Sequence, residues 1–279
     1  MNLAPLRNAT ENAKPWEGDI KKKPWEYEIT AIIPVIDTYE PLLLIIKLLK
    51  LQTIKPYIVI IDTGSLPENR WKIESLQDES TEVHSLKLNS VQHPSDFVAM
   101  ACDLGAAVCR TEYMFYTHAD CFLMRQNVLE NMLNLCKENP IVLYRLTQIK
   151  FEGWEKMWGH TLLMMNTKTY LENRLLWNLK QFEYYYDLQN HFPDDSRQGY
   201  PDTEIMINCI CQDLNIKPLI IGDEENYKRN QNEDFDHCRT FTSGLLYAKD
   251  YYNICKEWMK NAMNEAEERI KKWESDAIS

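Results

Sequence analysis

Acidic residues and a histidine follow three apolar runs of this sequence, at the point where each run ends. Asp37 comes shortly after the first run, Asp62 closes the second, and His118-Ala119-Asp120 closes another. Carboxylates and imidazoles can hold divalent cations and can take or give protons near neutral pH. These residues are therefore candidates for a metal site or for acid–base chemistry, provided that the fold brings them to one place.

The first half of the chain predicts the elements that would do this. Nearly continuous β-branched and apolar runs at 29–35 and 57–61 are typical of strands buried on both faces. Strands that alternate with helices indicate right-handed βαβ units and a mostly parallel α/β sheet, in which ligands bind beyond the carboxyl ends of the strands. Two further strands are expected at 81–88 and 112–117, and helices at 40–51, 67–76 and 96–109.

The second half is less regular. We expect a polar arm over 1–27, packed by Trp16 and Trp25, and a C-terminal helix whose apolar stripe packs into the core or against another copy of the chain. Strands are expected at 141–150, 161–165 and 216–221, helices at 168–189, 202–214 and 246–279, and loops at 191–199 and 223–236. The stripe consists of Tyr247, Tyr251, Ile254, Trp258, Ala262, Ala266, Ile270 and Trp273.

Composition narrows the class of protein. The 279 residues are 44% hydrophobic and carry a formal net charge of −11. Such a chain can bury a core, which excludes intrinsic disorder, and its surplus of acid disfavours broad adhesion to nucleic acid or to anionic membranes. The sequence contains neither GxGxxG nor GxxxxGK[ST], so neither a Rossmann dinucleotide site nor a P-loop is indicated.

The cysteine pattern and the lack of a recognisable targeting signal predict a cytoplasmic protein. The first residues lack the apolar core of a signal peptide, and we find no apolar stretch of the ~18 residues that a spanning helix needs. None of the eight cysteines forms a CxxC pair, and the Cys209-x-Cys211 pair lies in a helix-like segment. We expect buried free thiols in a cytoplasmic protein without membrane insertion.

Short motifs with a known order and spacing extend over about 28–222. They read IIPV at 32–35, LQT at 51–53, IIDTGS at 60–65, ACDLG at 101–105, TEYMFYTHAD at 111–120, WGHT at 158–161 and PDTE at 201–204. This series resembles family 2 glycosyltransferases, whose usual patterns include P-V-Y-N, Q-T, V-D-D-G-S, A-R-N-x-G, D-A-D and E-D-x-D. The resemblance implies the GT-A fold, an α/β domain with a mostly parallel central sheet.

The resemblance also implies roles for the matching positions. Asp202 would be the general base that removes the proton of an acceptor hydroxyl. Asp120 would hold a divalent metal at the donor diphosphate, with His118 and His237 as further candidate ligands. The implied donor-binding residues are Pro34, Val35, Asp37, Asp62, His118 and Asp120. The implied acceptor-binding residues are Trp158, Gly159, His160 and Glu204.

Several positions depart from the family pattern. His118 replaces the first Asp of D-A-D, and it either ligates the metal, which favours Mn²⁺ over Mg²⁺, or hydrogen-bonds the sugar. Thr63 and Asp37 replace the second Asp of D-D-G-S and the Asn after the first strand. A UDP-sugar is the expected donor, but these two changes leave the base open. Cys102 and Pro201 replace the Arg of A-R-N and the Glu before the base.

The candidate residues also have structural alternatives. Asp62 could cap the helix that follows it, and Asp202 could be only an N-cap. The aromatic side chains near the acceptor motifs could stack on sugars, but such a cluster more often serves packing. These aromatic residues are Trp154, Trp158, Tyr184, Tyr185 and Tyr186.

Together these observations predict an arm (1–27), a GT-A domain (28–245) with a donor half (28–120) and an acceptor half (121–245), and a C-terminal helix (246–279). The expected function is metal-dependent, inverting transfer of a hexosyl or pentosyl group to a hydroxyl of a glycan, a protein or a modified nucleic-acid base. A nucleic-acid acceptor stays open because the Lys21–Lys23 run could contact phosphates, but it is not favoured because acidic residues predominate over 183–236.

Two alternatives differ in class. The first is a catalytically inactive sugar- or nucleotide-binding relative, which the altered D-A-D motif would suit. The second is a nucleotidyltransferase, which usually needs a Gly-rich, basic loop near the first strand to hold a triphosphate, and this sequence has none.

Overall fold

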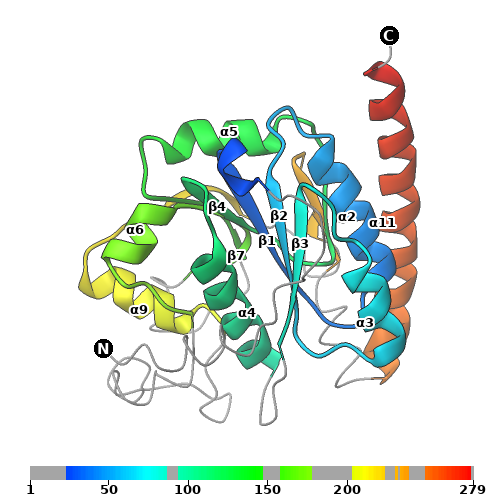
Figure 1. Cartoon of the computed structure of the whole chain (residues 1–279), viewed down its shortest axis with the longest axis horizontal. Coiled ribbons are helices and arrows are strands. Elements are labelled where there is room, and N and C mark those ends of the chain that lie inside the picture. The colour runs from blue at the N-terminus through cyan, green and yellow to red at the C-terminus, as the bar shows by residue number, and fades with distance from the viewer. Residues whose placement is uncertain are drawn as a thin grey trace.

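The computed structural model describes residues 23–86, 94–146, 158–177, 203–223, 230–231, 233–238 and 249–277. Its centre is a seven-stranded sheet with the order β3-β2-β1-β4-β7-β6-β8 (Figure 1). The strands are β1 (Ile29–Val35), β2 (Tyr57–Asp62), β3 (Thr81–Ser85), β4 (Tyr113–Tyr116), β6 (Ile141–Leu146), β7 (Gly159–Asn166) and β8 (Leu219–Asp223).

The direction of the strands determines which strand ends lie at the same edge of this sheet. β1 pairs in parallel with β2 and β4, β2 with β3, and β6 with β8, whereas β7 is antiparallel to both of its neighbours. Six strands of this sheet therefore point one way, and β7 points the other way. The predicted mostly parallel α/β sheet is confirmed, and the carboxyl ends of β1, β2 and β4 share one edge.

Successive side chains along each strand point to opposite faces of the sheet, so the core has a part on each face. In β1, Ala31 and Ile33 pack in one cluster of buried side chains, while Ile32 packs in the opposite cluster. The same alternation runs through β4, where Phe115 joins the first cluster and Tyr116 the second. Because these strands are buried on both faces, their sequences are continuous apolar runs.

Helices cover both faces of the sheet (Figure 1). The first cluster lies under α2 (Tyr39–Lys50), α3 (Pro67–Glu74), α5 (Val128–Cys136) and α11 (Lys249–Asp276). The second cluster, on the opposite face, is covered by α4 (Pro94–Val108), α6 (Thr167–Glu172) and α9 (Ile205–Asp213). The sheet is thus sandwiched between two helical layers, and its carboxyl edge is the place where loops can form a site.

The C-terminal helix packs within the chain. Four residues of its predicted apolar stripe, Ala262, Ala266, Ile270 and Trp273, are buried in the first cluster, whereas Trp258 is only half-buried. The helix α11 runs alongside α2 (Figure 1). Of the two predicted alternatives, packing into the core is the one that the structure shows. The buried residues of α11 are Met259, Ala262, Ala266, Ile270 and Trp273.

A second, three-stranded sheet was not expected from the sequence. It consists of β5 (Cys121–Leu123), β10 (Phe235–His237) and β9 (Asn230–Gln231), in the order β5-β10-β9. The prediction of a loop over 223–236 is wrong at these positions, because β8 extends to Asp223 and β10 begins at Phe235. β10 carries His237 and pairs with β5, which directly follows Asp120.

Three other expectations need correction. The helix predicted over 168–189 ends at Glu172, since Arg174 takes a left-handed conformation (φ 51°), and 178–189 lie outside the described residues. The strand predicted at 216–221 begins only at Leu219. Trp25, in the short 3₁₀ helix η1 (Pro24–Glu26), is 70% exposed rather than packed, and Trp16 is outside the described residues.

Two further properties concern the whole described chain. The seven cysteines whose side chains are described are free and buried, as expected. Among the described residues, no helix combines the length and the apolar character needed to cross a membrane.

Gly105 lets α4 approach β1 closely. A Cβ atom added at Gly105 would lie 2.3 Å from Cγ2 of Ile32, a buried and β-branched side chain with little freedom to move. Gly105→Ala should therefore destabilise the chain by about 1–3 kcal/mol, despite alanine's better helix propensity. Thermal unfolding should show this as a lower Tm, by about 2–4 °C per kcal/mol.

A double-mutant cycle checks the cause of that loss. Ile32→Ala removes the methyl group that clashes, so Gly105→Ala should cost less in the Ile32→Ala background than in the wild type. Equal losses in both backgrounds would contradict the proposed contact.

Candidate active site

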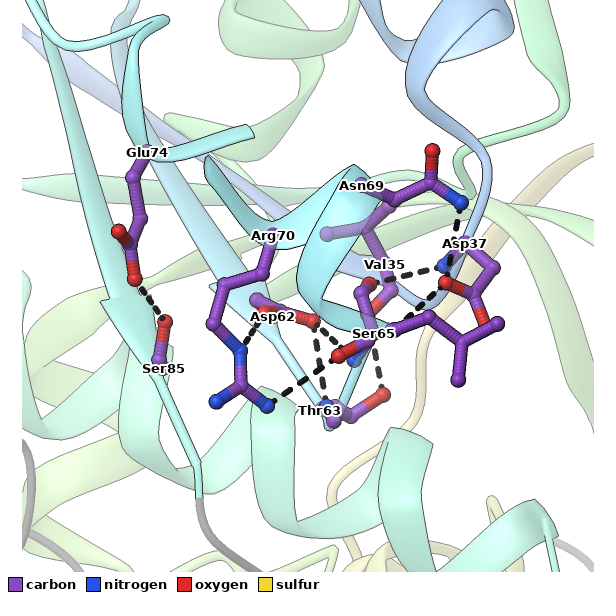
Figure 2. Close-up of polar contacts among 11 residues, drawn as sticks. Val35, Asp37, Asp62, Thr63, Ser65, Asn69, Arg70, Glu74 and Ser85 are labelled. Carbon is purple, nitrogen blue, oxygen red and sulfur yellow. Dashed lines mark hydrogen bonds and ion pairs between the residues drawn. The ribbon is translucent and has the colours of Figure 1, made fainter. Parts of the chain in front are cut away.

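The turn after β2 is built around the carboxylate of Asp62, which is fully buried (Figure 2). Its Oδ1 accepts hydrogen bonds from the N–H groups of Gly64 (3.1 Å) and Ser65 (2.8 Å). Its Oδ2 lies 3.4 Å from Nε of Arg70. Gly64 has a φ of +119°, which side chains rarely tolerate, so glycine is required in this turn. Oδ1 is thus hydrogen-bonded within the protein, whereas Oδ2 has the ion pair with Arg70 and no hydrogen bond to any described residue.

Asp37 joins the end of β1 to the start of α3. Its backbone N–H donates to Oγ of Ser65 (2.9 Å), and its Oδ1 accepts from the N–H of Leu66 (2.8 Å) and from Nδ2 of Asn69 (3.1 Å). Asp37 itself has a left-handed backbone (φ 51°), which Asp tolerates better than most residues. These bonds fix the loop after β1 against the helix that follows β2 (Figure 2).

Thr63 also connects the loops that follow β1 and β2. Its N–H and its hydroxyl both donate to the carbonyl oxygen of Val35, at 2.9 and 3.0 Å. Val35 is buried and Pro34 is partly exposed. The predicted donor-binding residues at the ends of β1 and β2 therefore form one connected unit.

The predicted metal-binding residues lie together. His118, Asp120 and His237 each offer one ligand atom, and these three atoms lie within 4.8 Å of one another. Nε2 of His237 is 3.4 Å from Oδ1 of Asp120, and the rings of His118 and His237 are stacked with centroids 5.0 Å apart. Two imidazoles and a carboxylate are a donor set that suits a first-row transition metal, so these residues fit a metal ion.

The small sheet places His237 in this cluster. His237 pairs with Cys121 in the antiparallel register of β10 and β5, and the N–H of Cys238 donates to the carbonyl oxygen of Asp120 (2.9 Å). At the other end of β10, the carbonyl oxygen of Asp234 accepts from the N–H of Met124 (2.8 Å). Both ends of β10 are thus tied to the segment that follows Asp120.

Side chains before β10 reinforce that position. The Asp234 carboxylate accepts a hydrogen bond from the hydroxyl of Tyr144, and its Oδ1 lies 3.4 Å from Arg125, which also pairs with Glu233. Burial and this hydrogen bond raise the pKa of Tyr144 far above its usual value, so its hydroxyl remains a donor. No sequence motif indicates these residues, because their partners lie far away in the chain.

On the acceptor side, Asn208 joins α9 to the start of β7. Its Oδ1 accepts from the N–H of Trp158 (3.0 Å), and its Nδ2 donates to the carbonyl oxygens of Trp158 (2.8 Å) and Glu204 (2.9 Å). Asn208 is fully buried, and Trp158 and Glu204 are also buried. This amide, which no sequence motif had indicated, holds two acceptor-side segments together.

Two other predicted acceptor-side residues are described only in part. Gly159 and His160 belong to β7 and pair with Leu146 and Arg145 of β6, but the His160 side chain lies outside the described part of the chain. The structure thus places both residues at the amino end of β7, beside Trp158.

The predicted base is not among the described residues. Asp202 and Pro201 lie outside them, as do the aromatic residues Trp154 and 184–186. The structure therefore gathers the metal residues and, separately, joins the loops after β1 and β2 to each other, whereas the role of Asp202 stays a prediction.

Cys102 stands at the position of the arginine in the family motif, and it is not a reactive thiol. Burial raises the pKa of Cys102 well above its usual value, and the carboxylates of Asp103 and Glu204 raise this pKa further. The neighbouring Asp103 has a packing role, since its Oδ1 accepts from the hydroxyl of Tyr170 (2.7 Å) and the N–H of Trp177 (2.9 Å).

Comparison with known proteins decides the family. Residues 30–198, more than half of the chain, match the model of glycosyl transferase family 2. The chain belongs to glycosyl transferase family 2. Its seven-stranded α/β sheet is accordingly that of the GT-A fold, as the motifs predicted.

Solved structures show more distant similarity to this family 2 chain. TarS of S. aureus is 12% identical (TM-score 0.43), and the match covers 54% of this chain but only 30% of TarS. Apo GlyE of Streptococcus pneumoniae TIGR4 is 11% identical (TM-score 0.49), and the match covers 90% of this chain and 64% of GlyE.

A third structure is the mannosyltransferase PcManGT of Pyrobaculum calidifontis, solved with GDP-Man and Mn²⁺. It is 13% identical, with a TM-score of 0.45, and the match covers 99% of this chain and 82% of PcManGT. The curated proteins contain no significant match to the sequence. The family assignment thus rests on the sequence model rather than on these distant structures.

The Asn208 contacts predict a large effect on stability. Asn208→Leu should lower the free energy of unfolding by about 2 kcal/mol or more, because the buried N–H and carbonyl groups of Trp158 lose these partners. Urea denaturation should measure the loss. Asn173→Ala is the matched control: it removes one bond from a partly exposed amide to the carbonyl of Thr169 (2.9 Å) and should cost less than about 1 kcal/mol. Similar small losses in the two variants would contradict a special role for Asn208.

Proposed function

We propose that this chain is a metal-dependent, inverting glycosyltransferase that moves a sugar from a nucleotide-sugar donor to a hydroxyl acceptor. The observation that supports this most directly is the gathering of His118, Asp120 and His237 beside the carboxyl edge of the sheet in a member of glycosyl transferase family 2. Inversion is proposed from the family resemblance.

The metal would be held by the two imidazoles and the carboxylate of this cluster. When bound, a divalent cation supplies positive charge that neutralises the departing nucleoside diphosphate. Imidazole is a softer ligand than a carboxylate, which favours Mn²⁺ over Mg²⁺. Three protein ligands leave further coordination positions for the oxygens of the donor.

The donor nucleotide would lie against the loops after β1 and β2, lined by Pro34, Val35, Asp37 and Asp62. The carboxylate of Asp62 is fully buried and its Oδ1 holds the turn after β2, so we assign it to fixing the shape of this pocket. Direct contact of Asp62 with a base would require this fully buried side chain to become accessible. The identity of the base is thus a matter for experiment, with UDP-sugars as the first candidates.

The acceptor would bind near Trp158, Gly159, His160 and Glu204, and Asp202 would take the proton of its hydroxyl. A sugar or protein hydroxyl is a poor nucleophile near pH 7, and a positioned base typically contributes a factor of about 10²–10⁴ to the rate. The contacts of Asn208 support this assignment because they fix Glu204, two residues after Asp202, against the start of β7.

Asp120→Ala should abolish sugar transfer and donor hydrolysis. The purified chain with Mn²⁺ should release nucleoside diphosphate from one member of a panel of UDP-, GDP- and other nucleotide sugars, and that donor should raise the Tm only when Mn²⁺ is present. The variant should lose both responses. Asp213→Ala, which removes an exposed carboxylate at the end of α9, is the control and should keep both. Undiminished turnover in Asp120→Ala, with wild-type folding, would contradict the metal assignment.

Asp202→Asn separates binding from proton removal. Because the amide keeps the shape but cannot accept the proton, the variant should bind donor and Mn²⁺ as the wild type does while its kcat falls by about 10²–10⁴-fold. Initial rates of donor turnover together with the Kd for the nucleotide measure the two effects. A kcat close to that of the wild type would remove Asp202 as the base. Donor binding without turnover in the wild-type chain would instead indicate an inactive relative.

A further inference from the structure

The LQT motif at 51–53 lies away from the strand ends that carry the donor loops. Leu51 follows the last residue of α2, and β2 begins at Tyr57, so the motif lies at the edge of the sheet where the parallel strands start. Gln52 is buried, whereas Thr53 is exposed. The donor loops and the metal residues follow the opposite ends of the strands, so any role of the motif in their chemistry is indirect.

The side chain of Gln52 binds the segment that connects β5 to α5. Its Nε2 donates to the carbonyl oxygen of Arg125 (2.8 Å), and its Oε1 accepts from the N–H of Leu129 (3.3 Å). These partners lie 73 and 77 residues further along the chain. The two polar atoms of one buried amide thus hold this segment against the end of α2.

The residues on each side of Gln52 contact the same segment. The N–H of Thr53 donates to the carbonyl oxygen of Gln126 (2.7 Å), and Nε2 of Gln126 donates to the carbonyl oxygen of Leu51 (3.1 Å). The hydroxyl of Thr53 also donates to Oε2 of Glu130 (3.0 Å). All three residues of the motif therefore bind the stretch that follows β5.

That stretch is also bound to the strand that carries His237. The N–H of Met124 donates to the carbonyl oxygen of Asp234 (2.8 Å). The side chain of Arg125 forms ion pairs with Glu233 and Asp234. The motif at the end of α2 and the start of β10 thus hold the same short segment, from two sides.

The strand pair β5–β10 connects this segment to the metal residues. The two strands are antiparallel, so the start of β10 lies opposite Leu123 and its last residue, His237, lies opposite Cys121. An extended chain rises about 3.3 Å per residue, which puts Arg125 about 13 Å from Cys121. Gln52 therefore holds the end of the strand pair that lies farther from His237.

We infer that Gln52 is a positioning residue for the metal site: by fixing the carbonyl of Arg125, it keeps β5 in register with β10 and so keeps His237 beside Asp120. Two strands of three residues each are marginal on their own, so their register depends on what holds their ends. The inference rests on the metal centre of the proposed function, but the ordering of the strands can be measured without metal or donor.

Hydrogen exchange of the full chain, followed by mass spectrometry after metal has been stripped with a chelator, tests this inference. Gln52→Met keeps about the length of the side chain but removes the partner of the Arg125 carbonyl and of the Leu129 N–H. Amides over 121–126 and 235–238 should then exchange about tenfold faster or more, because the strand pair opens locally. Amides of β1 should change much less.

Two further variants separate the positioning role from a loss of stability. Thr30→Val is the matched control, because it removes a buried hydrogen bond to the hydroxyl of Thr111 (2.8 Å) and should leave exchange over 121–126 and 235–238 unchanged. Gln126→Met removes the bond to Leu51 but keeps the contacts of Gln52, so it should accelerate exchange in the same two segments by a smaller factor. It also keeps the inference testable if Gln52→Met fails to fold.

A looser strand pair should also weaken the metal site. In calorimetry, Gln52→Met should bind Mn²⁺ about 5–10-fold more weakly than the wild type, at or below the roughly 10–100-fold loss that follows removal of a direct hydrogen-bond partner of a metal ligand. The KM for Mn²⁺ should rise by a similar factor, while kcat at saturating Mn²⁺ stays close to that of the wild type. Thr30→Val should change neither value.

Three results would overturn the inference. Exchange that accelerates equally in β1 and in the two segments would show that Gln52 stabilises only the fold as a whole. Unchanged exchange over 121–126 and 235–238 in a folded Gln52→Met variant would show that other contacts hold the strands. Wild-type Mn²⁺ affinity despite faster local exchange would show that the metal residues do not depend on this register.

Failure of the proposed function would look different. A wild-type chain that neither binds Mn²⁺ nor turns over donor would refute the proposed activity. Faster exchange confined to the two segments in Gln52→Met would still support the positioning of His237 by Gln52.

Discussion

The antiparallel pairing of β5 with β10 is the contact on which the candidate site depends. β5 directly follows the His118-Ala119-Asp120 triplet, and β10 ends in His237. Neither strand exceeds three residues, so the pairing is kept in register by the contacts of Asp234 at one end and by the Cys238–Asp120 bond at the other. Without this small sheet, nothing in the described structure would hold the imidazole of His237 beside Asp120.

Much of the large sheet could be predicted because its signals are local. β1 and β2 are continuous β-branched runs, and α2 repeats apolar residues at helical spacing. These patterns are enough to predict two strands and a helix. The strand-end positions of Asp37, Asp62 and Asp120 follow from the same patterns and from the parallel direction of the strands. The residue types of the metal cluster could also be named in advance, although their proximity could not.

The rest of the fold and of the candidate site depends on contacts that a local sequence pattern does not reveal. β9 and β10 are too short to show a period of two, and no glycine marks the left-handed position at Arg174 after α6. Asp62 was recognisable as a strand-end carboxylate, but only the structure shows that its Oδ1 accepts from Gly64 and Ser65 and that its Oδ2 pairs with Arg70. The role of Asn208 was hidden for a similar reason, because it binds the backbone of a residue far away in the chain.

The reversed direction of β7 has a consequence for how such a protein can diversify. Because β7 runs against its neighbours, it starts at the edge where β1, β4 and β6 end, and Leu146 and Gly159 face each other there. The stretch that links β6 to β7 therefore leaves and rejoins the sheet at the edge that carries the candidate site. Insertions or deletions within it would not shift the register of the strands or the ligands of the metal cluster. One connection can thus vary in length at that edge while the pairing of the strands stays the same.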